Sequence, residues 1–78
     1  MAKPSPTHAG NPVLVKLGGS IKAIREAKGL SQESVALVSG IDRSYFGGVE
    51  RGEYNVAVIN LEKIAVALGV SLKDLFKK

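Results

Sequence analysis

The feature that most constrains the fold of this chain is a pair of short helical patterns joined at Gly40, between Gln32 and Val49. Ala36 is small enough for one helix to cross the other closely, and Gly40 is permissive enough for a tight turn. A set of apolar residues recurs at helical intervals and would hold the two helices at a fixed angle: Val35, Ile41, Phe46 and Val49. The spacing predicts a helix-turn-helix, whose second helix can enter a major groove of DNA. Any two consecutive amphipathic helices could share this pattern, so the flanking sequence has to be considered.

Length and composition exclude several classes of protein. Seventy-eight residues make one small domain, and the absence of cysteine excludes disulfides and thiolate metal ligands. No run approaches the roughly 18 apolar residues of a membrane span, and the first six residues lack the apolar stretch of a signal peptide. We therefore expect a cytoplasmic protein without a membrane partner. The net charge of +4 is compatible with a polyanionic partner but does not identify one.

The first helix is predicted over residues 12–28, after a flexible tail over residues 1–11. Asn11 can cap this helix, Pro12 suits its first position, and Gly29 can end it. Two glycines inside it, Gly18 and Gly19, each cost about 1 kcal/mol relative to alanine unless a close helix contact requires them. Residues 12–78 are predicted to form the folded domain.

Four more helices are predicted along the rest of the chain. Ser31 caps a helix over residues 32–39, and Asp42 caps one that runs through Arg51. A loop over residues 53–58 follows, with Asn55 at its turn. The next helix covers residues 59–68, and Ser71 with Asp74 forms a capping box for a last short helix. The fold class is therefore all-α, with five helices and no strand.

The order of several short motifs resembles the lambda-repressor-like, Cro and xenobiotic-response-element type helix-turn-helix family. The resemblance extends over about residues 13–76. Two segments, Asp42-Arg43-Ser44-Tyr45-Phe46 and residues 59–64, are most similar to the small controller proteins of restriction-modification systems. The motifs that carry it are Gly29-Leu30-Ser31-Gln32, Gly40, Val49-Glu50-Arg51-Gly52, residues 60–65 and residues 67–71.

The resemblance implies a compact DNA-binding domain in which the helix that follows Asp42 recognises bases. It implies base-facing positions at Arg43, Ser44 and Gly48, and phosphate contacts from Gln32, Arg51, Tyr45 and Asn55. The physical argument is clearest for Arg43, because a planar guanidinium can donate to two guanine acceptors at once. The alternatives are a solvated charge at Arg43, ordinary helix chemistry at Ser44, and a Tyr45 ring that lies on the domain surface.

Two departures from the family pattern affect the predicted helix over residues 43–51 and the helix after it. Gly47 and Gly48 together should cost about 2 kcal/mol of helical preference. Gly48 has no side chain, so one base-reading position would be empty. Ala57 cannot cap the following helix as serine or threonine would. Glu50 resembles a family residue that is usually structural and holds arginine or backbone groups in place. We do not assign it to DNA, because a carboxylate facing phosphates would be repelled.

Apolar residues without an obvious interior role suggest a second copy of the chain as a partner. Members of this class pair across a two-fold axis and bind half-sites about one helical turn apart. We expect the dimer contact among Val56, Val58, Ile59 and Val66, with Leu72 of the last helix. The alternative is that these are scattered surface residues that need no partner.

The sequence predicts a transcriptional regulator and not an enzyme. The only histidine, His8, lies in the predicted tail, and no cluster of acidic residues, histidine and cysteine suggests a metal site. We expect double-stranded DNA and a homodimer partner, consider RNA polymerase as a further partner, and expect no cofactor, membrane or small-molecule ligand. The alternative function is a protein-binding module such as an antitoxin. Gly47 and Gly48 in the predicted recognition helix, and the nearly neutral charge of residues 42–55, are also compatible with it.

Overall fold

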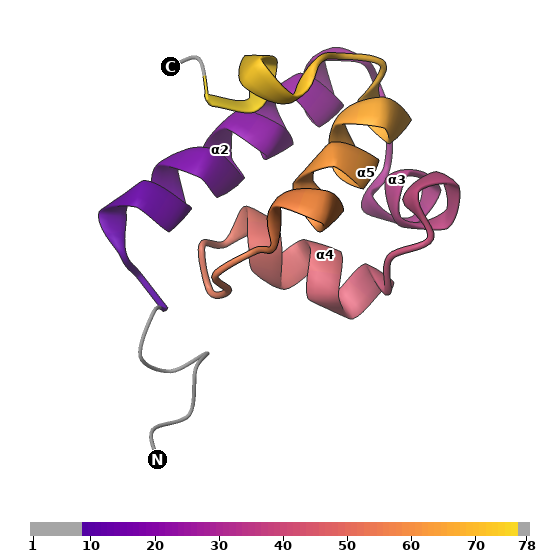
Figure 1. Cartoon of the computed structure of the whole chain (residues 1–78). Coiled ribbons are helices and arrows are strands. Elements are labelled where there is room, and N and C mark those ends of the chain that lie inside the picture. Colours follow the sequence, from indigo (N-terminus) through magenta and orange to yellow (C-terminus); the bar gives the residue numbers. More distant parts are fainter. Residues whose placement is uncertain (1–8, 77–78) are drawn as a thin grey trace.

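The computed structural model describes residues 9–76, in which four α-helices are followed by a 3₁₀-helix and no strand forms (Figure 1). Contacts join α3 with α5, α2 with α4, and α3 with α4, while η1 packs on both α2 and α5. This arrangement places the two ends of the described chain near α2, with α4 along one edge of the domain (Figure 1). The elements are α2 (Pro12–Ala27), α3 (Gln32–Ser39), α4 (Arg43–Glu50), α5 (Val58–Leu68) and η1 (Leu72–Phe76).

The prediction of five α-helices is wrong in its last member. The segment Leu72–Phe76 is a 3₁₀-helix of five residues. Its first turn is closed by the N–H of Asp74, which donates to the carbonyl oxygen of Ser71 at 3.0 Å, three residues back. A segment this short cannot build a series of α-helical hydrogen bonds, and 3₁₀ turns are common in such short pieces. The Asp74 carboxylate also accepts from the Ser71 N–H at 3.0 Å, which is one half of the predicted capping box.

The predicted helix starts are confirmed by their side-chain caps. Asn11, Ser31 and Asp42 each accept a backbone N–H of the first helical turn, at 2.9, 3.0 and 3.1 Å respectively. No side chain caps α5, because Ala57 stands at the position before it, as the sequence predicted. At the turn between α3 and α4, Gly40 has a φ of +74°, a conformation that side chains with a Cβ rarely adopt. The sequence therefore predicted the helix-turn-helix itself correctly.

One of the two glycines in α2 is required by a close helix crossing. A Cβ on Gly18 would lie 2.5 Å from the carbonyl oxygen of Glu50, at the end of α4. A Cβ on Gly19 would have no atom within 4 Å. The missing side chain at Gly18 thus lets α2 touch the backbone of α4, and this contact offsets the low helix propensity of glycine there.

The core lies where the helices meet, and it includes a residue that the sequence assigned elsewhere. Val56 is buried and belongs to the core cluster, so the expectation that it has no interior role is wrong. Its loop has no helical or strand period, so no pattern in the sequence indicated the direction of its side chain. Leu72, also predicted at a dimer contact, is partly buried against the same cluster. The largest fully buried side chains are Phe46, Ile21, Ile64, Leu68, Leu75, Val35 and Val49.

The start of the chain is only partly covered by the structure. Most of the predicted tail over residues 1–11, including His8, lies outside the described residues. Gly10 donates its N–H to the carbonyl oxygen of Gly52 at 3.1 Å, so the fold includes at least this part of the predicted tail. Across residues 9–76, none of the helices combines the length and the apolar character needed to cross a bilayer.

Candidate nucleic-acid interface

The first turn of α4 is exposed, whereas the rest of the helix is buried. Arg43 and Ser44 lie in solvent directly after the Asp42 cap, and the helix is buried from Phe46 to Glu50. The partial positive charge of a helix amino end adds to the charge of Arg43 at this place. The two residues predicted to face bases therefore lie together on the part of α4 that protrudes from the domain.

Arg43 is connected to the amino end of the preceding helix. Its Nη1 donates to Gln32 Oε1 at 3.0 Å, and Gln32 Nε2 donates to Glu50 Oε1 at 2.8 Å. Gln32 is the first residue of α3, whereas Arg43 and Glu50 are the first and last residues of α4. These polar contacts therefore join the two helices of the helix-turn-helix, from the exposed Arg43 to the buried Glu50.

Glu50 ends this set of contacts inside the protein, in an ion pair with Arg25 of α2. Arg25 Nε donates to Glu50 Oε2 at 2.7 Å and Arg25 Nη2 donates to Oε1 at 3.1 Å. The Arg25 and Glu50 side chains are only 11% and 2% exposed. The hydrogen bond with Glu50 raises the pKa of Arg25 above its ordinary value, although burial acts in the opposite direction. The prediction that Glu50 has a structural role is confirmed.

The predicted base-facing position at Gly48 is wrong. Gly48 is buried, and a Cβ there would collide with the Tyr54 ring, 2.8 Å from its Cδ2, so this position faces the inside of the domain. Gly47 is also buried, but it lies under the polar side chains of this surface: a Cβ there would lie 3.3 Å from Arg51 Nη1 and 3.6 Å from Gln32 Oε1. The reason is helical register, because Gly47 lies four residues after Arg43 and therefore shares its face.

Tyr45 lies against the domain surface. Its ring centroid is 4.9 Å from that of Tyr54, with the two planes tilted by 34°. Both rings also pack against the core cluster. Of the two alternatives from the sequence, the structure therefore supports the ring on the surface, and a phosphate contact of the hydroxyl stays a prediction.

Arg51 forms an exposed ion pair just after α4. Its Nε donates to Glu53 Oε2 at 2.7 Å, and this hydrogen bond raises the pKa of Arg51 and lowers that of Glu53. The guanidinium is therefore accessible but partly neutralised by its neighbour. Asn55, in the loop that follows, lines a small hollow with residues at the start of α2. The phosphate contacts predicted for Gln32, Arg51 and Asn55 stay predictions.

A second exposed surface joins the end of α3 to α5. Val38, Ile59 and Val66 are 62–70% exposed and line one hollow of about 260 Å³ together with Ser39, Glu62 and Lys63. Ile59 and Val66 belong to the set predicted at a dimer contact, whereas Val38 of the same hollow does not. The sequence offered a signal, because Leu37 and Val38 adjoin two buried residues and one helix cannot direct all four inward. Val58, exposed at the start of α5, is the other predicted residue in this region.

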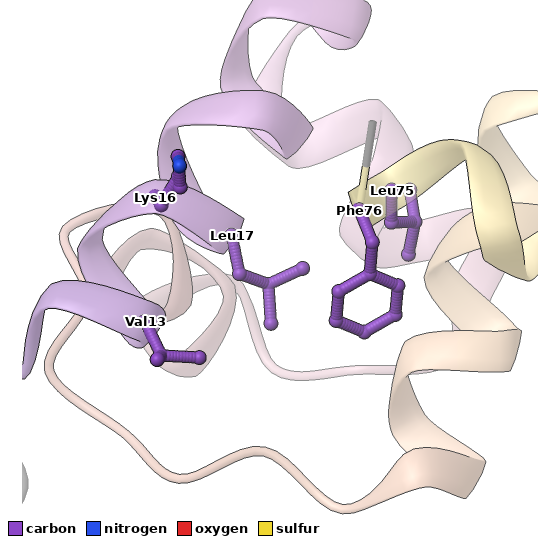
Figure 2. A pocket seen from close by; sticks show the side chains of 5 residues that line it. All are labelled: Val13, Lys16, Leu17, Leu75 and Phe76. Carbon is purple, nitrogen blue, oxygen red and sulfur yellow. The ribbon is translucent and has the colours of Figure 1, made fainter. Parts of the chain in front are cut away.

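An apolar hollow of about 110 Å³ lies between α2 and η1 (Figure 2). Figure 2 shows Leu17 of α2 extending toward Phe76 of η1, with Val13 and Lys16 flanking the hollow along α2. Val13 and Phe76 are exposed, whereas Leu17 and Leu75 belong to the core. Nothing in the sequence predicted this hollow. In the part of the chain that is described, no group of three or more histidine, cysteine, aspartate and glutamate side chains could hold a metal ion.

Comparisons with known proteins identify the family of the helix-turn-helix described above. The family model described as helix-turn-helix (HTH_3) covers residues 21–75. The control protein C.MunI of a Mycoplasma species is 42% identical over 67 residues, which are 85% of this chain and 90% of the relative. The control protein C.BamHI of Bacillus amyloliquefaciens is 41% identical over 66 residues, 83% of this chain and 82% of the relative. These relatives are regulators and not enzymes.

A solved structure shows the same fold. The crystal structure of the restriction-modification controller protein C.AhdI from Aeromonas hydrophila superimposes with a TM-score of 0.79 and 54% sequence identity. The match covers 81% of this chain and 96% of that one. The similarity thus extends over nearly the whole of that controller protein and includes both helices of the helix-turn-helix.

Proposed function

We propose that this chain, which belongs to the helix-turn-helix family of transcriptional regulators, is a controller of a restriction-modification system that binds double-stranded DNA as a homodimer. The observation that carries the proposal is the exposed first turn of α4, where Arg43 and Ser44 protrude from an otherwise buried helix. The similarity to C.MunI, C.BamHI and C.AhdI over most of their lengths supports the controller role. RNA polymerase is the further partner that such a regulator would meet at a promoter.

Base recognition would come from the amino end of α4. The Arg43 guanidinium can donate to O6 and N7 of one guanine, and the Ser44 hydroxyl can donate to or accept from a neighbouring base. Gln32, Arg51 and the Tyr45 hydroxyl are the groups that would contact phosphates and fix the orientation of the domain on the duplex. Neither Gly47 nor Gly48 has a side chain that could contact a base, so part of the selectivity would come from DNA shape.

A second copy of the chain would double the number of base pairs that are read. The hollow lined by Val38, Ile59 and Val66 supports an isologous contact, in which the same surface of each copy takes part. Glu62 and Lys63 border this hollow, so each copy offers both signs of charge to the other. Two domains related by a two-fold axis would bind half-sites about one helical turn of DNA apart.

The proposal is tested by selecting binding sequences from a library of random duplexes. We expect enrichment of sequences with two-fold symmetry, and an affinity for them that falls steeply as the salt concentration rises. Failure to enrich any sequence at low salt would contradict the proposal. A methyltransferase gene and an endonuclease gene beside the gene for this chain would support the restriction-modification role.

The dimer is tested by sedimentation with a matched pair of variants. Val66 and Val13 are 70% and 67% exposed and lie in different hollows. We expect the wild type and Val13→Lys to form dimers at tens of micromolar and Val66→Lys to remain monomeric, because a buried unpaired lysine opposes association. Dimers of equal stability in both variants would exclude the surface around Val66.

The alternative function is a protein-binding module such as an antitoxin. The observation that favours this alternative is Leu37. This residue is 82% exposed and lines an open hollow together with Glu33 and Asp42. An apolar residue beside acidic groups could receive a protein partner better than a polyanion. A toxin gene beside the gene for this chain, together with failure of the duplex selection, would favour this alternative.

A further inference from the structure

We infer that Glu50 is a positioning residue for base recognition: through Gln32 it sets the orientation of the Arg43 guanidinium, although Glu50 itself lies inside the protein. The inference rests on the proposed function, in which Arg43 reads a base. It assigns to a buried carboxylate a part in sequence discrimination in addition to its part in the fold. Four side chains from three helices carry it: Arg25, Glu50, Gln32 and Arg43.

The first step is that Glu50 determines which way the Gln32 amide points. A carboxylate only accepts hydrogen bonds, so the amide NH₂ of Gln32 turns toward Glu50 Oε1, at 2.8 Å. The amide oxygen is then directed to the other side, where it accepts from Arg43 Nη1 at 3.0 Å. A reversed amide would place its oxygen against the carboxylate and its NH₂ against the guanidinium, which has no acceptor.

The second step is that Glu50 is itself held firmly. Both of its oxygens accept from Arg25, at 2.7 and 3.1 Å. Arg25 also donates through Nη1 to the carbonyl oxygen of Leu30 at 2.9 Å, in the segment between α2 and α3. The orientation of Gln32 is therefore fixed by the contact between α2 and α4, which is part of the folded core.

The third step is that the hydrogen bond with Gln32 leaves the other guanidinium donors of Arg43 free to bind a base. Gln32 takes Nη1, so the Nε and Nη2 donors remain for the two acceptors of a guanine. Gly47, one turn further along α4, adds no side chain to the space between Gln32 and Arg51. An arginine held in this way loses less conformational freedom on binding than a free one.

The free protein is the first test, because it requires no DNA. The variant Gln32→Met removes both polar contacts of the amide and leaves the Arg25–Glu50 pair intact. We expect ¹⁵N relaxation to show the Arg43 Nε group less ordered in Gln32→Met than in the wild type, while the Arg25 Nε group stays ordered. The conservative variant Glu50→Gln, checked for folding by circular dichroism, should also loosen Arg43, since an amide no longer dictates the orientation of Gln32. Equal order of Arg43 in the wild type and in Gln32→Met would overturn the inference.

The second test measures discrimination on DNA. The quantity is the ratio of Kd values for the selected operator and for the operator altered at the base pair whose recognition is lost in Arg43→Ala. We expect Gln32→Met to lower this ratio by about two- to tenfold, the range for fixing one flexible side chain on binding. When Arg43→Ala is already present, adding Gln32→Met should not lower this ratio of Kd values any further. The control Glu33→Gln, an exposed neighbour in the same helical turn, should leave the ratio unchanged.

The outcomes separate the inference from the proposed function. If Gln32→Met weakens binding to all sequences equally, Gln32 acts only on the phosphate backbone and the inference is wrong. If Arg43→Ala changes discrimination at no base pair, the assignment of base recognition to Arg43 fails, and the positioning role fails with it. The Kd measurements on Arg43→Ala alone show whether base recognition by Arg43 fails, and they do not depend on the result of the relaxation experiment.

Discussion

Two arginine–glutamate pairs in this domain have almost the same geometry but lie in opposite surroundings. In both, the arginine Nε lies 2.7 Å from the glutamate Oε2, and a second contact follows at 3.1 Å for Arg25–Glu50 and 3.3 Å for Arg51–Glu53. The side chains are 11% and 2% exposed in the first pair, and 61% and 41% exposed in the second. The first joins α2 to α4, whereas the second joins residues two positions apart.

The difference shows that contact geometry alone does not decide what an ion pair does. Burying two charges has a large desolvation cost, so a buried pair adds little net stability, but removing one partner leaves a charge with no compensation. An exposed pair is hydrated and screened by salt, and adds between 0 and about 1 kcal/mol. We therefore assign Arg25–Glu50 to the fold and to the positioning of Arg43, and Arg51–Glu53 to the tuning of surface charge.

The largest expected effect comes from breaking the buried pair. Glu50→Ala should lower the free energy of unfolding by about 3–5 kcal/mol, because Arg25 would remain buried without its partner. The matched change Glu53→Ala should lower it far less, because this pair is exposed, hydrated and screened by salt. Urea denaturation measures both values. Similar losses for the two variants would contradict the contrast between the pairs.

The next effect concerns the close approach that brings Arg25 to Glu50. Gly18→Ala would place a Cβ against the backbone at the end of α4, which cannot move aside as a flexible side chain can. We expect a loss of about 1–3 kcal/mol, as for an overpacked core. Gly19→Ala, with open space at its Cβ, should gain up to about 1 kcal/mol from helix propensity. A stabilised Gly18→Ala in thermal and urea denaturation would show that the crossing of α2 and α4 is looser than described.

A smaller effect is expected on DNA affinity from the exposed pair. Glu53→Gln removes the carboxylate that holds Arg51 and raises the net charge by one. We expect tighter binding to all duplexes at low salt, and a plot of log K against log salt that is steeper by about 0.9 if Arg51 gains one phosphate contact. Titrations at four salt concentrations measure the slope. An unchanged slope together with unchanged affinity would argue against a phosphate contact from Arg51.

The smallest effect is the acid dependence of the exposed pair. The pKa of Glu53 lies below its ordinary value of 4.5, so its contribution to stability is present above that pH and is lost as the pH falls through the lowered value. The difference in Tm between the wild type and Glu53→Gln should therefore be small at pH 7 and should shrink toward zero as the pH falls below 4.5. A Tm difference that grows as the pH falls would contradict this prediction, because the lowered pKa of Glu53 requires the opposite trend.

Local chemistry explains why much of the fold could be predicted from the sequence. The caps at Asn11, Ser31 and Asp42 are hydrogen bonds between near neighbours, so the residue types and their spacing were sufficient. The turn at Gly40 was predicted for the same reason. The type of the last helix was not, because a five-residue segment contains too few positions to distinguish an α-helix from a 3₁₀-helix.

The site was predicted less completely because parts of it depend on contacts between distant residues. Arg25 and Glu50 are 25 positions apart, and no local pattern connects them. The error at Gly48 came from helical register: Gly47, four residues after Arg43, is the glycine that shares its face. Val56 was misassigned because an irregular loop has no period from which the direction of a side chain can be read.

The most direct test of the account compares Arg43→Ala with Lys22→Ala, an equal change of charge at an exposed position of α2. Binding of both variants to the selected operator and to single base-pair variants of it is measured at one fixed salt concentration. We expect Arg43→Ala to lose about 1–3 kcal/mol of discrimination at one base pair of each half-site, while Lys22→Ala keeps the discrimination of the wild type. Discrimination by Arg43→Ala equal to that of the wild type at every base pair would contradict the claim that α4 reads DNA through Arg43.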